Sequence, residues 1–226
     1  MDVRKIVNSL IEDIANGTSI NQILLKAQIV AFNIDDKRFS QLIKNEQQGY
    51  SAKDEIPDYR KQKTMVKATF VDSFQNVQTV EVHSEAIEDE RIRDLMTYVF
   101  VREPLIQVEN MYKNADSAMV RVPVPVFAYP TIKSLYEGYN VGVYSAYHCF
   151  PKESLLTIVE TFKAQLMDLL LQFDKKLNLN VDLADEKNKA MVQSIINNVY
   201  HIHAVVANTG EGCVNTNDIR LKKLPR

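Results

Sequence analysis

The stretch LLTIVETFKAQLMDLLLQF, residues 155–173, carries the longest apolar pattern of the chain and decides its fold. Its apolar side chains recur three and four positions apart, which is the spacing of one face of an α-helix. Pro151 stands just before this stretch. A helix with so wide an apolar face is stabilised mainly by packing, so we expect it to organise the core. The predicted face consists of Leu155, Ile158, Val159, Phe162, Leu166, Leu169, Leu170 and Phe173.

Three shorter helices are predicted near the N-terminus, over residues 3–15, over residues 20–32, and from an aspartate at 35 or 36 to about Gly49. Apolar positions recur at helical spacing in each of them. Asn16-Gly17 is typical of a helix C-terminus, and Thr18 or Ser19 can cap the second helix. The first fifty residues are therefore predicted to be helical.

From Thr64 the period of the pattern changes from helical to twofold. Residues 64–71 and 77–83 alternate on either side of Asp72-Ser73, which predicts a β-hairpin. Residues 85–100 return to helical spacing. The charged residues Glu85, Glu88, Asp89, Glu90, Arg91 and Arg93 are interpreted as a solvated helix N-terminus. Pro104 is expected to open a further helix, because proline is tolerated in the first turn.

Two more extended segments are predicted, at residues 118–127 and 139–150. The first contains Pro123 and Pro125, which cannot donate hydrogen bonds to a strand ladder. We therefore expect it to be an edge strand or to leave the sheet early.

The last part of the chain reads as an appendage. A weaker helix is predicted over residues 185–197, followed by the β-like run Val199–Val206, a turn over 208–212 and a short strand to Ile219. The predicted class is α+β: an N-terminal helical segment, a small antiparallel sheet, a long C-terminal core helix and a short β-like appendage. The expected organisation is one domain over residues 1–180 and a separable assembly segment over 181–226.

Composition excludes several classes of protein. The chain has 226 residues, of which 46% are apolar and 25% charged, unlike collagen-like or broadly disordered chains. Its net charge of -2 gives no global basic field for nucleic acid or membrane. Two cysteines, Cys149 and Cys213, fit a reducing compartment. No signal segment or membrane span is visible, so the sequence predicts a cytoplasmic protein without a membrane partner.

No residue pattern specifies a reaction. His201 and His203 would share one strand face, as in some metal sites, but spacing supplies no third ligand, so no metal and no cofactor are expected. His148 and Cys149 are adjacent on a predicted strand and would point to opposite faces, which disfavours a thiol nucleophile. Residues 138–142 lack the lysine of a phosphate-binding loop.

The loop Ile56–Arg60 places a guanidinium beside a phenol and a carboxylate. Such a donor fork either binds an external anion or pins its own loop, and we favour pinning. The signature loop comprises Tyr50, Pro57, Asp58, Tyr59 and Arg60. Five later tyrosines, Tyr129, Tyr136, Tyr139, Tyr144 and Tyr147, suit either base stacking or core and interface packing, and we favour packing.

The order of these motifs resembles a known family. A helix ending Asn45-Glu46-Gln47-Gln48-Gly49-Tyr50, followed by Ile56-Pro57-Asp58-Tyr59-Arg60, is similar to the N-terminal pattern of the AbiTii family of abortive-infection-associated bacterial proteins. Ile56 stands where that pattern usually has leucine, and the acidic residue lies at Glu46. The long helix to Lys176 is also similar. The resemblance implies a part in antiphage defence and carries over no established active site.

Three functional hypotheses follow. The first is a non-enzymatic defence module that forms homo-oligomers or binds another defence-system protein by strand addition. Its self-association residues would be Val199, Tyr200, Ile202, Val205 and Val206. The second is a toxin enzyme acting on nucleic acid or a nucleotide through Tyr59, Arg60, His201 and His203. The third is a nucleic-acid-binding scaffold that uses Arg220, Lys222, Lys223 and Arg226.

Overall fold

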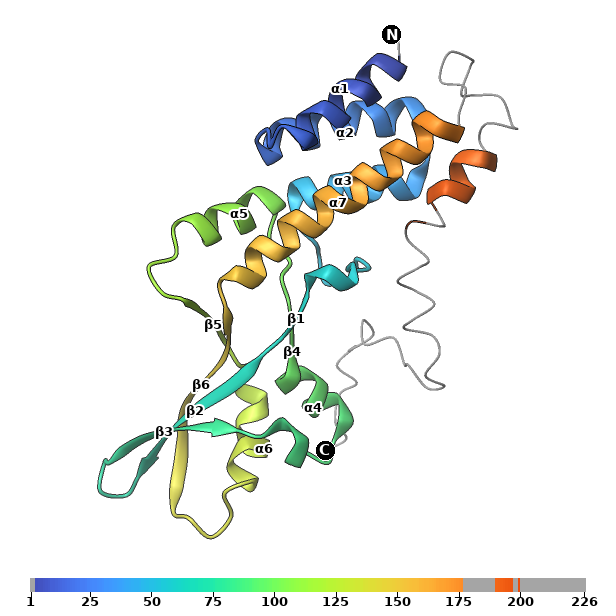
Figure 1. The fold of residues 1–226 in the computed structure, drawn as a ribbon. Coiled ribbons are helices and arrows are strands. Elements are labelled where there is room, and N and C mark those ends of the chain that lie inside the picture. The colour runs from blue at the N-terminus through green and yellow to red at the C-terminus, as the bar shows by residue number, and fades with distance from the viewer. Residues whose placement is uncertain (1–2, 177–189, 197–198, 200–226) are drawn as a thin grey trace. The chain divides into compact units, whose positions relative to one another are not determined.

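A computed structural model describes residues 3–176, 190–196 and 199 of the chain (Figure 1). The chain folds into two compact units. The first comprises Met1–Asp58, Arg102–Asn110 and Ile158–Arg226, and the second comprises Tyr59–Val101 and Met111–Thr157. The α+β class is confirmed, with helices in both units and antiparallel sheets in the second. The predicted boundary between residues 180 and 181 lies outside the described residues and stays a prediction.

The first unit begins with three helices, α1 (Val3–Ala15), α2 (Ile20–Ile34) and α3 (Lys37–Gln48). All three were predicted from their apolar spacing. Gly17 ends the first helical segment with a φ of 68°, and Asp36 caps α3 by accepting from the backbone N–H groups of Arg38 and Phe39, both at 2.9 Å. Ser19 occupies the N-cap position of α2 but makes no side-chain capping bond.

The long predicted helix is α7 (Glu153–Lys176), and all eight residues of its predicted apolar face are buried. Phe173 near its end packs edge-on against Phe39 of α3, with ring centroids 6.4 Å apart. Figure 1 shows α7 alongside α3 in this unit. The helix therefore organises the core of the first unit, as expected from its width and length.

Residues 190–196 are helical, within the weaker helix predicted over 185–197. They bury Val192, Ile195 and Ile196. Val199 is also helical, and only 5% exposed, so the start of the predicted β-like run at this residue is wrong. The Val199 side chain is buried, and the residue is not part of an exposed strand. The rest of that run, residues 200–206, lies outside the described residues, as do the predicted turn, the final short strand and the basic tail.

The second unit contains a four-stranded antiparallel sheet in the order β3–β2–β6–β5. Its strands are β2 (Met65–Asp72), β3 (Val77–Val82), β5 (Met119–Pro123) and β6 (Val141–Pro151). The predicted hairpin is β2–β3, and β5 is the predicted edge strand. After Pro125 the chain leaves the sheet in the short helix η3 (Val126–Ala128). The prolines thus mark both the edge and the exit.

A second, two-stranded sheet joins β1 (Lys61–Lys63) to β4 (Tyr98–Phe100). The helix predicted over residues 85–100 is wrong at both ends, because the chain instead forms η2 (Ser84–Ala86), α4 (Glu90–Thr97) and then β4. Pairing with β1 and the placement of the Lys61 ammonium 4.1 Å from the Tyr98 ring centroid override the helical pattern at the C-terminal end. The solvated N-terminus of α4 is confirmed, since Asp89 caps it.

Two helices connect these strands. The predicted helix after Pro104 is α5 (Leu105–Lys113), whereas the short α6 (Tyr129–Ser134) was not predicted. Helix α6 has a proline, Pro130, in its first turn.

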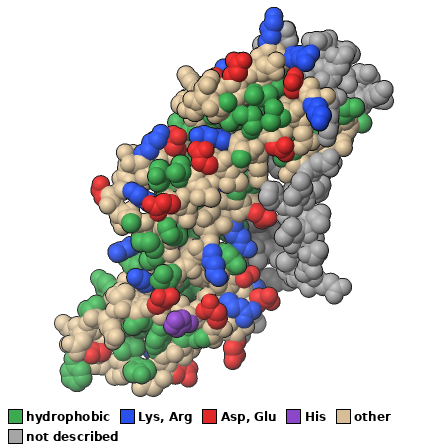
Figure 2. Space-filling view, in the orientation of Figure 1, with side chains coloured by type: hydrophobic (Ala, Val, Ile, Leu, Met, Phe, Trp, Pro, Cys, Tyr) green, Lys and Arg blue, Asp and Glu red, His purple; other side chains and the backbone are tan. Residues whose placement is uncertain are grey.

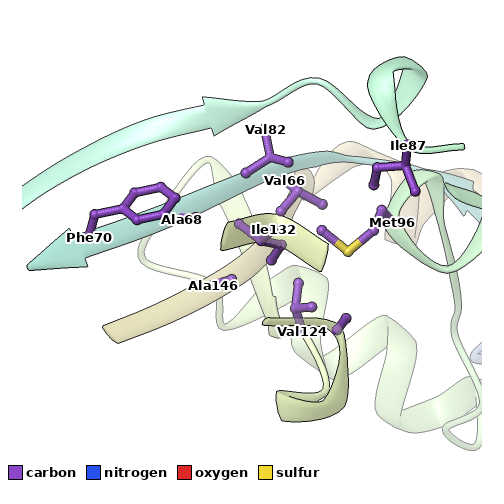
Figure 3. Close-up of a cluster of buried hydrophobic side chains, with 10 residues drawn as sticks. Val66, Ala68, Phe70, Val82, Ile87, Met96, Val124, Ile132 and Ala146 are labelled. Carbon is purple, nitrogen blue, oxygen red and sulfur yellow. The ribbon is translucent and has the colours of Figure 1, made fainter. Parts of the chain in front are cut away.

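One face of the four-stranded sheet is covered by α4 and α6 (Figure 3). Val66, Ala68 and Phe70 of β2 alternate toward this covered face, and Met96 of α4 and Ile132 of α6 pack against them. The odd-numbered residues of β2 point to the other side of the sheet, which we call the outer face. Strand alternation thus separates a buried core from a solvated surface.

Candidate functional site

Gly49 ends α3 in a backbone conformation that other residues rarely adopt, with φ 87° and ψ 171°. A Cβ atom at this position would lie 2.8 Å from the carbonyl oxygen of Arg102 and 3.1 Å from the ring of Pro104. The next residue, Tyr50, donates its backbone N–H to the same carbonyl at 2.8 Å. The Gly-Tyr pair therefore fixes the loop to the segment before α5.

The Tyr50 hydroxyl donates to the Glu46 carboxylate at 2.5 Å. Both residues are buried, with exposures of 6% and 0%. Glu46 lies in the last turn of α3, and Tyr50 follows the C-cap Gly49, so the turn of the chain at the glycine brings the tyrosine hydroxyl to the carboxylate. Sequence reasoning noted Glu46 only through the family pattern, because the turn at Gly49 that brings the two side chains together leaves no periodic signal in the sequence.

The polar connector after Tyr50 is ordered by local hydrogen bonds. The Ser51 backbone N–H donates to the Asp54 carboxylate at 2.6 Å, and Arg102 donates to the Ser51 carbonyl at 2.6 Å. The hydrogen bonds from Ser51 lower the pKa of the Asp54 carboxyl. The connector is therefore an ordered turn that leads into the segment containing Pro57.

Within the signature loop, Asp58 is exposed and Pro57 and Tyr59 are half-buried. Arg60 ends the short helix η1 (Asp58–Arg60) and is 0% exposed. Its guanidinium donates to the Val101 carbonyl at 2.8 Å, and the Val101 N–H donates back to the Arg60 carbonyl at 2.9 Å. A guanidinium enclosed in this way pins its own chain and is closed to an external anion.

The signature loop is not assembled as one site within either unit. Tyr50, Pro57 and Asp58 belong to the first unit, and Tyr59 and Arg60 belong to the second. Arg60 and Tyr50 are buried, and both hydrogen-bond to neighbouring backbone groups, which holds the chain in place. A residue that reacts with a substrate needs donor or acceptor groups that the substrate can reach.

His148 lies buried on β6 and shares a hydrogen bond of 2.8 Å between its Nδ1 and the Thr64 hydroxyl. Burial lowers the pKa of its imidazole to about 4. Cys149 is buried as a free thiol on the opposite side of the strand, so the two do not form a nucleophile and base pair. In the ranges that the structure describes, no three His, Cys, Asp or Glu side chains gather as metal ligands.

The predicted His201 and His203 pair lies outside the described residues, together with Tyr200, Ile202, Val205, Val206 and the tail residues Arg220, Lys222, Lys223 and Arg226. The five tyrosines divide between core and surface. The Tyr136 ring packs on Phe70 at 4.7 Å and its hydroxyl donates to the Glu81 carbonyl at 3.1 Å, whereas the Tyr129 hydroxyl accepts from the Ala146 N–H at 3.3 Å. Tyr139, Tyr144 and Tyr147 are exposed.

The comparison with protein families adds a direct assignment. The AbiTii family model matches residues 5–197, which is most of the chain. The chain belongs to the AbiTii family. This membership associates the AbiTii chain with abortive infection and antiphage defence. No curated protein and no solved structure matches it.

An exposed apolar surface of this AbiTii chain's second unit lies at the β2–β3 turn, where hydrophobic side chains gather in Figure 2. We call it the hairpin-end patch, and it consists of Phe74, Val77, Tyr139 and Tyr144, with exposures of 86%, 66%, 71% and 75%. The Asp72 carboxylate accepts from the N–H groups of Phe74 and Asn76 at 2.8 Å, and Asn140 donates to the Ser73 hydroxyl at 2.9 Å. These bonds hold the patch in place.

Among the described ranges, none of the helices has the length and apolar content needed to cross a bilayer.

Proposed function

We propose that this AbiTii chain is a non-enzymatic interaction module of an abortive-infection system that assembles into homo-oligomers. The observation that carries the proposal is the β3 edge of the sheet beside the hairpin-end patch, with which no further strand of the described residues pairs. Large exposed apolar surfaces and free strand edges are costly unless they serve an interaction.

The two edges of the sheet differ. The β5 edge carries Pro123 and is followed by Pro125, and proline cannot donate to an added strand. The β3 edge contains no proline, and its one charged residue is Glu81. In the described part of the chain no strand pairs with the outer side of β3. Strand addition is therefore supported at β3 and opposed at β5.

The register of β2 and β3 determines which backbone groups of β3 point away from β2. The Asp72 N–H donates to the Asn76 carbonyl at 3.2 Å, and paired residues of antiparallel strands alternate from there. The backbone groups of Val77, Thr79 and Glu81 then face away from β2. The 3.0 Å contact between the hydroxyls of Thr69 and Thr79 fits the close, non-hydrogen-bonded pairing expected at this position.

A second copy satisfies this edge by antiparallel pairing of β3 with itself. When the twofold axis passes through Thr79, each Val77 lies opposite Glu81 of the other copy, so the two glutamates are kept apart. The same pairing brings Phe74 and Val77 next to the other copy and reduces their exposure. Residues 200–206 are an alternative proposed source of the added strand, as the sequence pattern first indicated.

The test is the mass in solution by light scattering across a range of concentrations. We expect a dimer for the wild type and a monomer for Thr79→Pro, which removes an outward N–H and the hydroxyl contact with Thr69 but none of the backbone hydrogen bonds between β2 and β3. Val77→Lys should weaken the dimer, and Asn21→Lys, at an exposed position of α2 in the first unit, is the matched control. Circular dichroism verifies that each variant is folded.

A monomeric wild type at high concentration would contradict the proposed assembly. A dimer that survives Thr79→Pro but is lost on truncation before Tyr200 would transfer the interface to the C-terminal segment. The defence role is tested separately by phage plating on cells that carry the chain with its native neighbours. We expect protection by the wild type and by Asn21→Lys, and reduced protection by Thr79→Pro.

A further inference from the structure

A row of cations follows the outer side of the continuous extended segment β1–β2. From residue 61 to residue 68 the side chains alternate between exposed odd and more enclosed even positions. The exposed members are Lys61, Lys63, Met65 and Lys67. Successive members lie about 7 Å apart, because a strand advances by about 3.3 Å per residue. The result is a line of exposed side chains in which three of the four are lysines and Met65 separates the third from the first two.

The neighbouring strands add an aromatic side chain and a further cation to this face. Tyr147 of β6 lies directly opposite Lys67 and is 37% exposed. Arg121 of the edge strand β5 is exposed and lies opposite Cys149, which in turn lies opposite Met65. An aromatic ring thus lies among cations from two strands, on the side of the sheet that α4 and α6 leave uncovered.

Negative charge is scarce on this surface. The paired outer positions of the four strands contribute one carboxylate, that of Glu81 opposite Lys67. Within the described ranges, Lys63, Lys67 and Arg121 lie beyond ion-pair distance of any carboxylate. The positive charge is therefore local, although the whole chain has a net charge of -2.

We propose that the outer face binds single-stranded nucleic acid, with Lys63, Lys67 and Arg121 contacting phosphates and Tyr147 stacking on a base. Cations along one strand, with a further cation on β5, can contact several successive phosphates of one chain. A tyrosine on an open sheet gives unpaired bases a stacking platform, which an acidic peptide would not require. Base-paired nucleic acid keeps its bases stacked inside the duplex, so single strands are the favoured ligand. This site differs from the basic tail considered from the sequence.

The test is fluorescence anisotropy with labelled single-stranded oligouridylate and oligothymidylate, titrated with the full chain at several salt concentrations. The double variant Lys63→Glu/Lys67→Glu should weaken binding by at least about tenfold and reduce the slope of log K against log salt by about 1.4, the value for two phosphate contacts. Tyr147→Ala should weaken binding by about tenfold and leave the salt slope unchanged. The matched control, Lys37→Glu/Lys53→Glu, alters two exposed lysines of the first unit.

Absence of binding by the wild type, or equal binding by the wild type and the sheet variants, would overturn the proposal. Loss of binding on deletion of residues 220–226, with no effect of the sheet variants, would assign the affinity to the tail. Equal competition by polyglutamate or anionic vesicles, with no effect of Tyr147→Ala, would assign the face to another anionic partner. The assay uses purified protein and no phage, so its failure is distinguishable from failure of the proposed function.

Discussion

Gly49 and Gly17 both follow the end of a helix, so comparing them separates the cost of a positive φ from the cost of a steric overlap. Both have positive φ, but a Cβ at Gly49 would meet the Arg102 carbonyl at 2.8 Å, whereas a Cβ at Gly17 would meet nothing within 4 Å. We expect Gly49→Ala to lower the free energy of unfolding by roughly 3 kcal/mol, because backbone strain and steric overlap act together. Gly17→Ala should cost about 1 kcal/mol.

Chemical denaturation followed by helical circular dichroism measures the difference between the two variants. Equal losses at the two glycines would show that the contact of Gly49 with the segment before α5 contributes nothing. In that case the close approach of the Arg102 carbonyl would not explain why a glycine stands at position 49.

His148 makes stability depend on pH. Its pKa is lowered to about 4 in the folded chain against 6.5 in the unfolded chain, so the unfolded state binds the proton more readily. The stabilising effect of the neutral imidazole is fully present above pH 6.5 and is lost as pH falls toward 4, by up to about 3 kcal/mol. Wild-type stability should therefore fall between pH 7 and pH 5.

His148→Gln should flatten this pH dependence, whatever its effect on stability at neutral pH, and exposed His83→Gln is the control. The carboxyl groups of Asp54 and Asp72, whose pKa values are lowered by hydrogen bonds, titrate below this window and do not interfere. A pH slope that is the same in His148→Gln and in the wild type would assign the effect to other groups.

At the scale of elements, the sequence predicted what a local period can encode. The apolar face of α7, the alternation of β2 and β3 and the prolines of β5 all report on their own neighbours in the chain, and each prediction was confirmed. The strand β4 was missed because its three residues continue the helical spacing of α4, and only pairing with β1, about 37 residues earlier, makes them extended. Pairing between strands that are far apart in the sequence produces no periodic pattern within either segment.

The candidate site shows the same division. The signature loop could be found from its residues, but the burial of Arg60 against Val101 depends on a contact across 41 positions. The outer face could not be predicted either, since Lys63, Lys67, Tyr147 and Arg121 come from four strands whose spatial order no single segment of the sequence encodes. Tyrosines that looked alike in the sequence divide between Tyr129 and Tyr136, which pack against the core, and Tyr144 and Tyr147, which are exposed on β6.

At the scale of the whole molecule, the two proposals make a joint prediction. A twofold axis perpendicular to the sheet keeps the same side of both copies facing the same way, so β3 pairing would merge two outer faces into one continuous surface of eight strands. A single strand long enough to cross both faces then binds the second one at a high effective concentration. Affinity should rise steeply with ligand length only where the dimer forms.

We expect wild-type affinity to increase by at least about tenfold, beyond the statistical gain from extra sites, between oligonucleotides of about 8 and about 24 nucleotides. Thr79→Pro should bind the short ligand as the wild type does and lose the additional gain with the long one. Anisotropy titrations of both proteins with both ligands measure this. The same length dependence in the two proteins would mean that the outer faces act singly, because a monomer has one face and gains nothing from a ligand that reaches beyond it.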